Sequence, residues 1–194
     1  AINFMAKEAR GLICMPADSE VMDKLQFGAM VTHNTDNHET AFSVSIDHVD
    51  TTTGISAYER AYTMKKCAEP GAQPSDFRRP GHVFPLRARK GGVLVRTGHT
   101  ETTVDLCKLA GLQPVGICCE IMNNDGNMAR TPDLIEFAKK HKLVFITVAE
   151  LVAYRKAHEK MVHRAAEAAL PTKYGNFRII AYENDLDNLC HVAI

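Results

Sequence analysis

The sequence lacks an excess of charge of either sign, because 23 lysine and arginine residues balance 23 aspartate and glutamate residues. A neutral balance gives no reason to expect a nucleic-acid or membrane-surface partner. The sequence also lacks any apolar run near the roughly 18 residues that a membrane-spanning helix needs, and residues 1–10 carry no signal-peptide pattern. We therefore expect no nucleic-acid partner and no membrane partner.

Several catalytic signatures are absent as well: there is no HExxH, no GxSxG, no Walker loop and no GxGxxG. Hydride transfer, ATP use and serine hydrolysis lose support accordingly. The cysteines form no CxxC pair and are scattered as Cys14, Cys67, Cys107, Cys118, Cys119 and Cys190. A reduced cytosolic chain and a disulfide framework are the alternatives, and the length and core-forming composition favour the reduced chain.

What is present is the composition of a soluble globular protein, 45% hydrophobic and 24% charged. Apolar spacing predicts helices over residues 18–25, 57–68, 100–110, 131–141 and 147–160. Alternation and short apolar runs predict strands over residues 11–15, 41–47, 51–56, 82–87, 92–95, 115–122 and 143–146. Several of these strands adjoin with no helix between them, which indicates an α+β fold around a mixed sheet.

Composition shifts after about residue 159, where a helical run over residues 161–169 leads to strand-like segments at 177–183 and 191–194. This segment is too short to bury a core of its own. We therefore expect one domain over residues 1–160 and the truncated start of another over residues 161–194. Residues 1–10 already have the pattern of an amphipathic helix without a capping residue, so we also expect sequence upstream of Ala1 to be missing.

The loop Arg96–Glu101 joins a predicted strand to a predicted helix. A helix N-terminus offers unpaired N–H groups and partial positive charge, which suit a phosphate. Arg96 can fork onto phosphate oxygens, Gly98 allows close backbone approach, Thr100 supplies a hydroxyl, and His99 can bind metal or shuttle protons. The alternative is an ordinary turn with a solvated arginine.

His82 and Glu120 are the other candidates. His82 lies in Arg79-Pro80-Gly81-His82-Val83-Phe84-Pro85, where prolines and glycine fix the backbone; a structural histidine is the alternative. Glu120 lies in an otherwise apolar predicted strand, where an unpaired carboxylate is costly; the alternative is a partner for a structural arginine. The remaining loop histidines, His38 and His48 among them, are expected to be solvated. Together the candidates suit metal-assisted enolisation of a sugar phosphate.

These segments resemble the 3,4-dihydroxy-2-butanone 4-phosphate synthase family over residues 1–160, in order and at family-like spacing. The resemblance rests on Thr53-Gly54-Ile55-Ser56-Ala57, Arg79-Pro80-Gly81-His82-Val83-Phe84-Pro85-Leu86-Arg87, Gly91-Gly92-Val93-Leu94, Arg96-Thr97-Gly98-His99-Thr100-Glu101, Cys119-Glu120 and Met128-Ala129-Arg130. Leu170-Pro171-Thr172, Gly175, Phe177-Arg178 and His191-Val192-Ala193 resemble the opening of GTP cyclohydrolase II, which is fused to the synthase in many organisms.

The resemblance implies a riboflavin-biosynthesis lyase that converts ribulose 5-phosphate to 3,4-dihydroxy-2-butanone 4-phosphate and formate with Mg²⁺ or Mn²⁺ and no organic cofactor. It implies His82 and Glu120 as catalytic residues and His99 as a metal ligand. It implies that substrate, chiefly its phosphate, is bound by Arg96, Thr97, Gly98, His99, Thr100 and Glu120, with Cys14 and Thr53 lining the pocket.

It further implies a three-layer α/β/α sandwich, a homodimer and a cytoplasmic location, or a plastid if the source is a plant. One departure bears on activity: the family's acidic loop, which supplies another metal ligand, precedes the helix with which this sequence begins. A non-catalytic dimerising or sugar-phosphate-binding module is therefore the alternative. An unrelated metal-dependent aldolase or isomerase, supported only by His82, His99 and Glu120, is a third.

Overall fold

The computed structural model describes residues 1–187 and 189–194, which divide into two compact units, Ala1–Val148 and Ala149–Ile194. In the first unit the elements are α1 (Ile2–Phe4), η1 (Met5–Ala9), β1 (Cys14–Ala17), α2 (Ser19–Lys24), β2 (Ile46–His48), α3 (Ala57–Cys67), η2 (Pro74–Asp76), β3 (Phe77–Arg87), η3 (Gly92–Leu94), α4 (His99–Leu109) and α5 (Thr131–His141). Helix α6 (Val148–His158) leads into the strands of the second unit, β4 (Val162–Thr172), β5 (Gly175–Asn184) and β6 (His191–Ala193).

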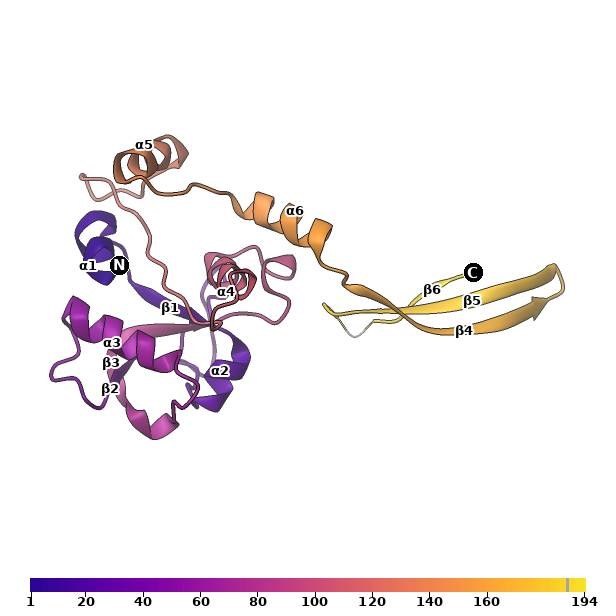
Figure 1. The fold of residues 1–194 in the computed structure, drawn as a ribbon, viewed down its shortest axis with the longest axis horizontal. Coiled ribbons are helices and arrows are strands. Elements are labelled where there is room, and N and C mark those ends of the chain that lie inside the picture. Colours follow the sequence, from indigo (N-terminus) through magenta and orange to yellow (C-terminus); the bar gives the residue numbers. More distant parts are fainter. Residues whose placement is uncertain (188) are drawn as a thin grey trace. The chain divides into compact units, whose positions relative to one another are not determined.

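The sheet of the first unit is mixed, as predicted. Its order is β1-β3-β2, with β1 parallel and β2 antiparallel to β3 (Figure 1). Successive side chains of a strand point to opposite faces, so Met15 of β1 joins Val83 of β3 in the hydrophobic core, to which α3 contributes Met64 and Cys67. Cys14 points to the other face, where the candidate site lies. The α+β class is confirmed, and the finer three-layer arrangement stays a prediction.

Three predicted strands of the first unit are wrong as strands. Residues 92–94 form η3 and Val95 is its C-cap; the buried Asp105 carboxylate accepts the Val93 N–H at 2.8 Å and so stabilises this turn. Residues 51–56 form a loop, and residues 143–146 have no regular structure and are exposed. Residues 115–122 run antiparallel to β1, but only as isolated bridges such as Cys14 with Cys118. His48 is buried rather than solvated.

The second unit contains an antiparallel sheet of order β4-β5-β6. The predicted helix at residues 161–169 is wrong, because these residues pair with β5 along most of its length. The predicted strand at residues 177–183 is confirmed within β5. The domain boundary expected after residue 160 stays a prediction, and it falls between α6 and β4.

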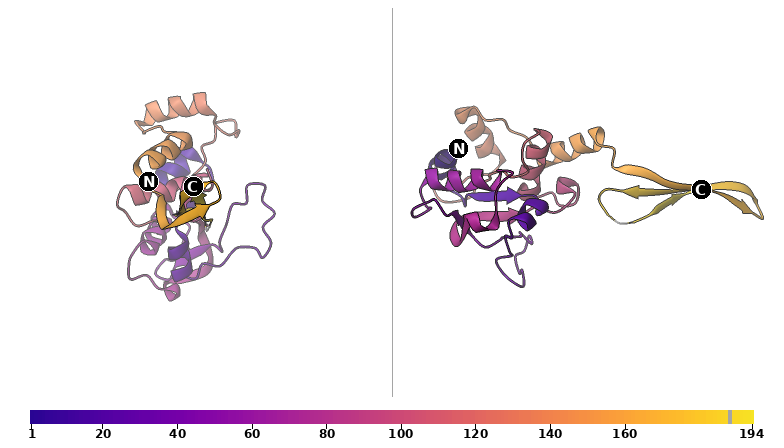
Figure 2. Two further views of the ribbon diagram at one scale, coloured as in Figure 1. Left: turned by 90° about the vertical axis from the view of Figure 1, so that its right-hand side faces the viewer. Right: turned by 60° about the horizontal axis from the view of Figure 1, so that its bottom comes forward.

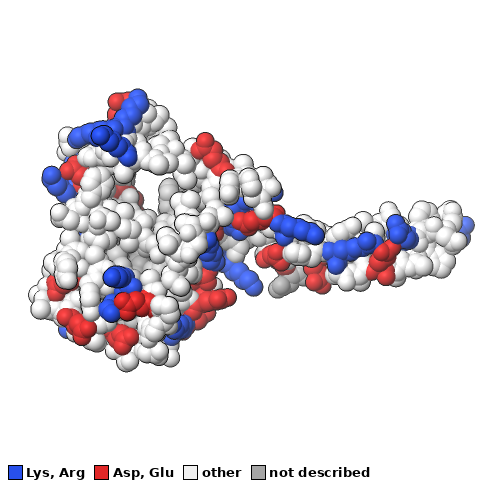
Figure 3. All heavy atoms as spheres, viewed as in Figure 1, with Lys and Arg blue, Asp and Glu red and all other residues white. Residues whose placement is uncertain are grey.

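Charged side chains of both signs are mixed over the face seen in Figure 3, in keeping with the neutral balance. Among the described helices, none is both long and apolar enough to cross a membrane. The long loop between α2 and β2 projects from the first unit (Figure 2), and its later residues contribute to the candidate site.

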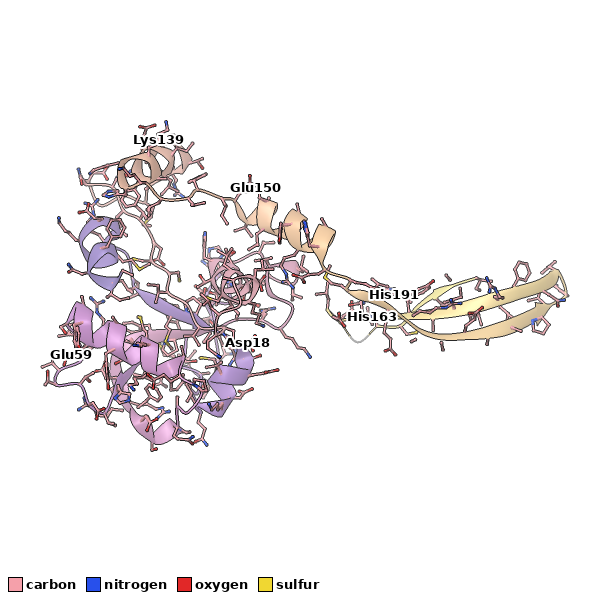
Figure 4. The ribbon with its side chains drawn as sticks, viewed as in Figure 1. Asp18, Glu59, Lys139, Glu150, His163 and His191 are labelled. Carbon is pink, nitrogen blue, oxygen red and sulfur yellow. The ribbon has the colours of Figure 1, made fainter. Side chains whose placement is uncertain are left out.

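Glu59 closes the N-terminal end of α3 (Figure 4). Its carboxylate accepts the Thr52 hydroxyl at 2.7 Å and the Thr52 N–H at 2.6 Å, and the Ser56 hydroxyl at 3.0 Å. These hydrogen bonds, led by the Thr52 hydroxyl, lower the pKa of Glu59 to about 2. They favour the ionised carboxylate and so tie its protonation to folding.

We predict that the stability contributed by Glu59 is complete above the unfolded-state pKa of about 4.3 and is lost as the pH falls toward 2. The difference in free energy of unfolding between the native protein and Glu59→Gln should therefore shrink from pH 6 to pH 2.5. Urea denaturation at both pH values measures it, with Glu136→Gln, an exposed carboxylate on α5, as control. A difference that stays constant would contradict the assignment.

Candidate active site

A cavity of about 560 Å³ lies on the Cys14 face of the first unit's sheet. Five separate segments line it: β1, the end of the α2–β2 loop, β3, the start of α4 and the segment that pairs with β1. The lining residues are Cys14, His38, Thr40, Phe42, Leu86, Arg96, Thr97, Gly98, His99, Thr100, Cys118 and Glu120. The structure therefore brings the Arg96–Thr100 loop together with Glu120 and Cys14, whereas His82 and Thr53 are not among the lining residues.

Helix α4 begins at this cavity without a side-chain cap. Gly98 is the N-cap, and the first intrahelical bond runs from the Thr102 N–H to the Gly98 carbonyl at 2.9 Å. The preceding N–H groups of the first turn have no partner inside the helix, as at any helix start. His99 is exposed and Thr100 is buried. This helix start can bind an anion through backbone N–H groups and the helix dipole.

Arg96 is held in place rather than solvated. Its Nη1 donates to Glu101 Oε2 at 2.6 Å and its Nη2 donates to the His38 carbonyl at 3.0 Å. The Glu101 side chain is only 1% exposed, and its Oε1 also accepts the Arg89 N–H at 3.0 Å. A Cβ on Gly98 would lie 2.2 Å from Arg96 Nη1 and 2.7 Å from Glu101 Oε2, so a larger residue there would displace this ion pair.

Glu120 is exposed at the cavity, not buried in an apolar strand as expected. The reason is that residues 115–122 pair with the β1 side only through isolated bridges and are not enclosed within a sheet. Its Oε2 accepts the Leu12 N–H at 2.9 Å. A Cβ on Gly11 would lie 2.7 Å from the same oxygen, so glycine at this position makes room for the carboxylate. The printed partner of the Glu120 carboxylate is thus a backbone N–H, not the structural arginine that was the alternative.

His82 is paired with a buried carboxylate that sequence reasoning missed. Its Nδ1 lies 2.7 Å from Asp47 Oδ2, and its backbone N–H donates to Asp47 Oδ1 at 3.0 Å. The Asp47 side chain is 7% exposed and that of His82 is 43% exposed. Such a pairing orients the ring and leaves Nε2 as the outward nitrogen. In the sequence, Asp47 shows only as the last residue of an alternating predicted strand, and nothing there links it to His82.

Thr53 lies next to this pair through its neighbour Gly54. Gly54 has a φ of 84°, and a Cβ there would lie 2.2 Å from Asp47 Oδ2, so its backbone closes directly over the carboxylate. Thr53 itself is exposed in the loop before α3. The structure therefore places Thr53 beside the Asp47–His82 pair rather than in the cavity lining.

The sheet relates His82 to the cavity. Cys14 of β1 is the parallel partner of Phe84 in β3, and His82 lies two residues before Phe84 on the same strand. His82 also shares a strand face with Leu86, which lines the cavity. Alternation along β3 therefore assigns His82 to the face that carries the cavity.

The two cysteines of the lining are protonated thiols at neutral pH. Burial is the main cause that raises the pKa of both Cys14 and Cys118 to about 12, and the nearby Glu120 and Cys119 raise both values further. A neutral thiol is a poor nucleophile and a poor metal ligand. Cys14 can shape the pocket, and its thiol reacts only slowly at neutral pH because little thiolate is present.

The fit of a divalent metal is partial. No three histidine, cysteine, aspartate or glutamate side chains converge as a ligand cluster among residues 1–187 and 189–194. His99 is the exposed imidazole at the helix start, with His38 and Glu120 elsewhere in the lining. Mg²⁺ favours oxygen ligands from carboxylates, water and substrate. The described residues therefore offer His99 as a candidate ligand but do not form a complete protein site.

Comparison with known proteins identifies the family. A family model described as 3,4-dihydroxy-2-butanone 4-phosphate synthase matches residues 1–154. The riboflavin biosynthesis protein RibBA of Bacillus mycoides (strain KBAB4) is 55% identical over 193 residues, covering 100% of this chain and 49% of the relative. RibBA of Bacillus cytotoxicus is 53% identical with the same coverage. The chain thus spans about half the length of these curated relatives.

Two solved structures agree. RibBX of A. baumannii, a two-domain 3,4-dihydroxy-2-butanone 4-phosphate synthase, superposes with a TM-score of 0.90 at 42% identity, covering 99% of this chain and 57% of that one. A 3,4-dihydroxy-2-butanone 4-phosphate synthase in complex with two magnesium ions gives 0.77 at 43% identity, covering 81% and 79%. The family-model match over residues 1–154 contains every residue that lines the cavity. The chain belongs to the 3,4-dihydroxy-2-butanone 4-phosphate synthase family.

Proposed function

We propose that this protein converts D-ribulose 5-phosphate to L-3,4-dihydroxy-2-butanone 4-phosphate and formate, a step of riboflavin biosynthesis. The observation that carries the proposal is one cavity that combines an uncapped helix start with Glu120. Alternation along β3 assigns His82, which is paired with Asp47, to the same sheet face as that cavity. An anion site beside two acid–base groups is what enolisation of a phosphorylated sugar requires.

The substrate's phosphate binds at the start of α4 in this proposal. The first-turn N–H groups and the Thr100 hydroxyl donate to its oxygens, and Thr97 and Gly98 shape the loop around it. Arg96 presents its guanidinium from a fixed position, because Glu101 and the His38 carbonyl already hold two of its nitrogens. It can therefore donate to the phosphate without rearranging, while the Glu101 carboxylate offsets its charge.

His82 and Glu120 exchange protons with the substrate's carbon and oxygen atoms. Asp47 keeps the His82 ring oriented, with Nε2 directed outward, so that the ring can accept and return a proton without reorganising. Glu120 accepts one backbone N–H on Oε2, which leaves its other oxygen for the substrate. Cys14 and the neighbourhood of Thr53 complete the pocket walls.

A divalent cation, Mg²⁺ or Mn²⁺, completes the chemistry, and no organic cofactor takes part. When bound, the cation lowers the cost of negative charge on neighbouring sugar oxygens. His99 is the residue of this chain that holds it. The support is the exposed imidazole at the cavity and the magnesium-bound solved structure of the same family.

We further infer that residues 1–160 form the synthase domain and that residues 161–194 begin a GTP cyclohydrolase II-like domain. The support is the end of the family match at residue 154 and the greater length of the RibBA relatives. A cytoplasmic homodimer, the state implied by the resemblance, completes the proposal.

The test supplies ribulose 5-phosphate and Mg²⁺ to the protein in its full natural length and measures formate with a coupled dehydrogenase. Formate should appear together with the four-carbon phosphate, and chelation with EDTA should abolish both. Absence of formate in the presence of metal would overturn the proposed function. A different product from the same sugar would point instead to an aldolase or isomerase.

We predict that His99→Ala lowers metal-dependent turnover by about 100-fold or more, since even changes behind a metal ligand cost about 10–100-fold. The helix should survive, because the His99 side chain makes no hydrogen bond within the described residues. Turnover against Mg²⁺ concentration and the circular dichroism melt measure the two effects. His163→Ala, an exposed histidine of β4 labelled in Figure 4, is the matched control. Full activity in His99→Ala would refute the ligand assignment.

We predict that Asp47→Asn lowers kcat by about 100-fold, on the scale of general acid–base catalysis, with a much smaller change in KM. The physical reason is that the amide no longer holds the His82 ring in one tautomer, whereas the phosphate site at α4 is untouched. Asp50→Asn, an exposed carboxylate three residues along, should leave both constants unchanged. Equal losses in the two variants would show that Asp47 only supports the fold.

A further inference from the structure

Cys14 and Cys118 face each other directly across two antiparallel segments. The Cys14 N–H donates to the Cys118 carbonyl at 2.9 Å, and the Cys118 N–H donates to the Cys14 carbonyl at 3.1 Å. Two residues that exchange both bonds form a hydrogen-bonded pair with Cα atoms about 5.5 Å apart. That separation lies in the middle of the range that disulfides span, about 4.4–6.8 Å.

Both side chains point the same way, because opposed residues of an antiparallel pair share a face. The shared face is that of the candidate active site, since Cys14 and Cys118 both line its cavity. A small oxidant that enters the cavity therefore meets both sulfur atoms. No other pair among the six free cysteines of the chain has this arrangement in the described structure.

The adjacent Cys119 provides a natural contrast. It follows Cys118 directly, so its side chain points to the opposite face, and its Sγ lies 3.3 Å from the Glu120 carbonyl oxygen. Cys119 is absent from the cavity lining. Proximity in sequence alone would not distinguish the two thiols, whereas the strand geometry does.

We propose that Cys14 and Cys118 are a redox-sensitive modification site. They form a reversible disulfide that inactivates the active site. The effect on activity rests on the proposed function; the bond itself does not. Two thiols give up two electrons and two protons to a small-molecule disulfide such as oxidised glutathione. One S–S bond forms between the cysteines, and the small disulfide is released as two thiols.

Bond formation changes the active site because the backbone has to move. Opposed Cβ atoms lie about 4.5–5.5 Å apart in an antiparallel pair, whereas a disulfide holds them about 3.8 Å apart. The Cys118 segment must therefore approach β1 by about 1 Å. Glu120 lies two residues further along that segment and on the same face, and its carboxylate depends on the Leu12 N–H of the facing segment. The shift displaces the catalytic carboxylate.

Burial makes the exchange slow. The pKa of each thiol is raised to about 12, so few thiolates are present at neutral pH. Cys118 is partly exposed and Cys14 is buried, so the mixed disulfide forms first on Cys118 and Cys14 then displaces the small thiol. A slow, reversible response suits sustained oxidative stress in a reducing compartment, where stable structural disulfides are rare.

The test incubates the chain with oxidised glutathione, alkylates the remaining thiols and maps the peptides by mass spectrometry. A Cys14–Cys118 cross-linked peptide, lighter by two hydrogen atoms than its reduced parts, is expected, and dithiothreitol should abolish it. Formate production should fall at least about tenfold in the oxidised protein and recover on reduction. Absence of the cross-link, or glutathione retained on Cys118 without it, would overturn the proposal.

Two variants distinguish a specific Cys14–Cys118 disulfide from general oxidation of the thiols. Cys118→Val should lose the cross-link and keep its own reduced-state activity through the oxidant treatment. Cys119→Ser, the matched control, should retain both the cross-link and the inactivation. A link from Cys14 to Cys119, or inactivation that persists in Cys118→Val, would contradict the pairing. Because the link is scored by mass, its failure is distinguishable from a protein that makes no formate even when reduced.

Discussion

The pairing of β3 with strands on both sides is the constraint on which the rest of the first unit depends. β1 runs parallel to it and β2 antiparallel, so residues distant in sequence are fixed at known positions along one strand. Alternation then separates the two faces. Met15 and Val83 enter the core with α3, while Cys14 and Leu86 face the cavity. Core packing and the candidate site are thus two faces of one sheet, and a slip of one residue would exchange them.

Buried carboxylates perform a second task, which is to hold backbone that has no regular structure. Glu101 and Asp105 lie four residues apart on one face of α4 and accept the N–H groups of Arg89 and Val93. They attach the β3–α4 loop to the helix that follows it. Asp47 does the same for the His82 N–H. A buried charge is costly unless it is satisfied by such bonds, so these three positions should tolerate little substitution, although the sequence assigned none of them a role.

The sequence was informative where structure is set locally. Helices α3 and α4 were predicted within a residue or two, because the apolar spacing that indicates them is contained in the segment itself. The Arg96–Thr100 loop and Glu120 were found by composition and do line one cavity. The failures involve long-range partners. Strand β4 was taken for a helix because only its pairing with β5 makes it extended, and Asp47 was missed because its partner His82 is 35 residues away.

The site combines fixed and unfixed groups in a way that matches its proposed chemistry. Arg96, His82 and Glu120 each have a partner that holds their charge or their proton-carrying atom in place before any ligand arrives. Preorganised charge of this kind costs no reorganisation when charge develops on a substrate. Thr97 and His99 differ, since both are exposed and their side chains make no hydrogen bond within the described residues. They are the groups free to adapt, and they lie at the helix start where phosphate and cation must be accommodated together. The proton-transfer residues and Arg96 are therefore held in place before the substrate binds, whereas Thr97 and His99 can adjust to the phosphate and the cation.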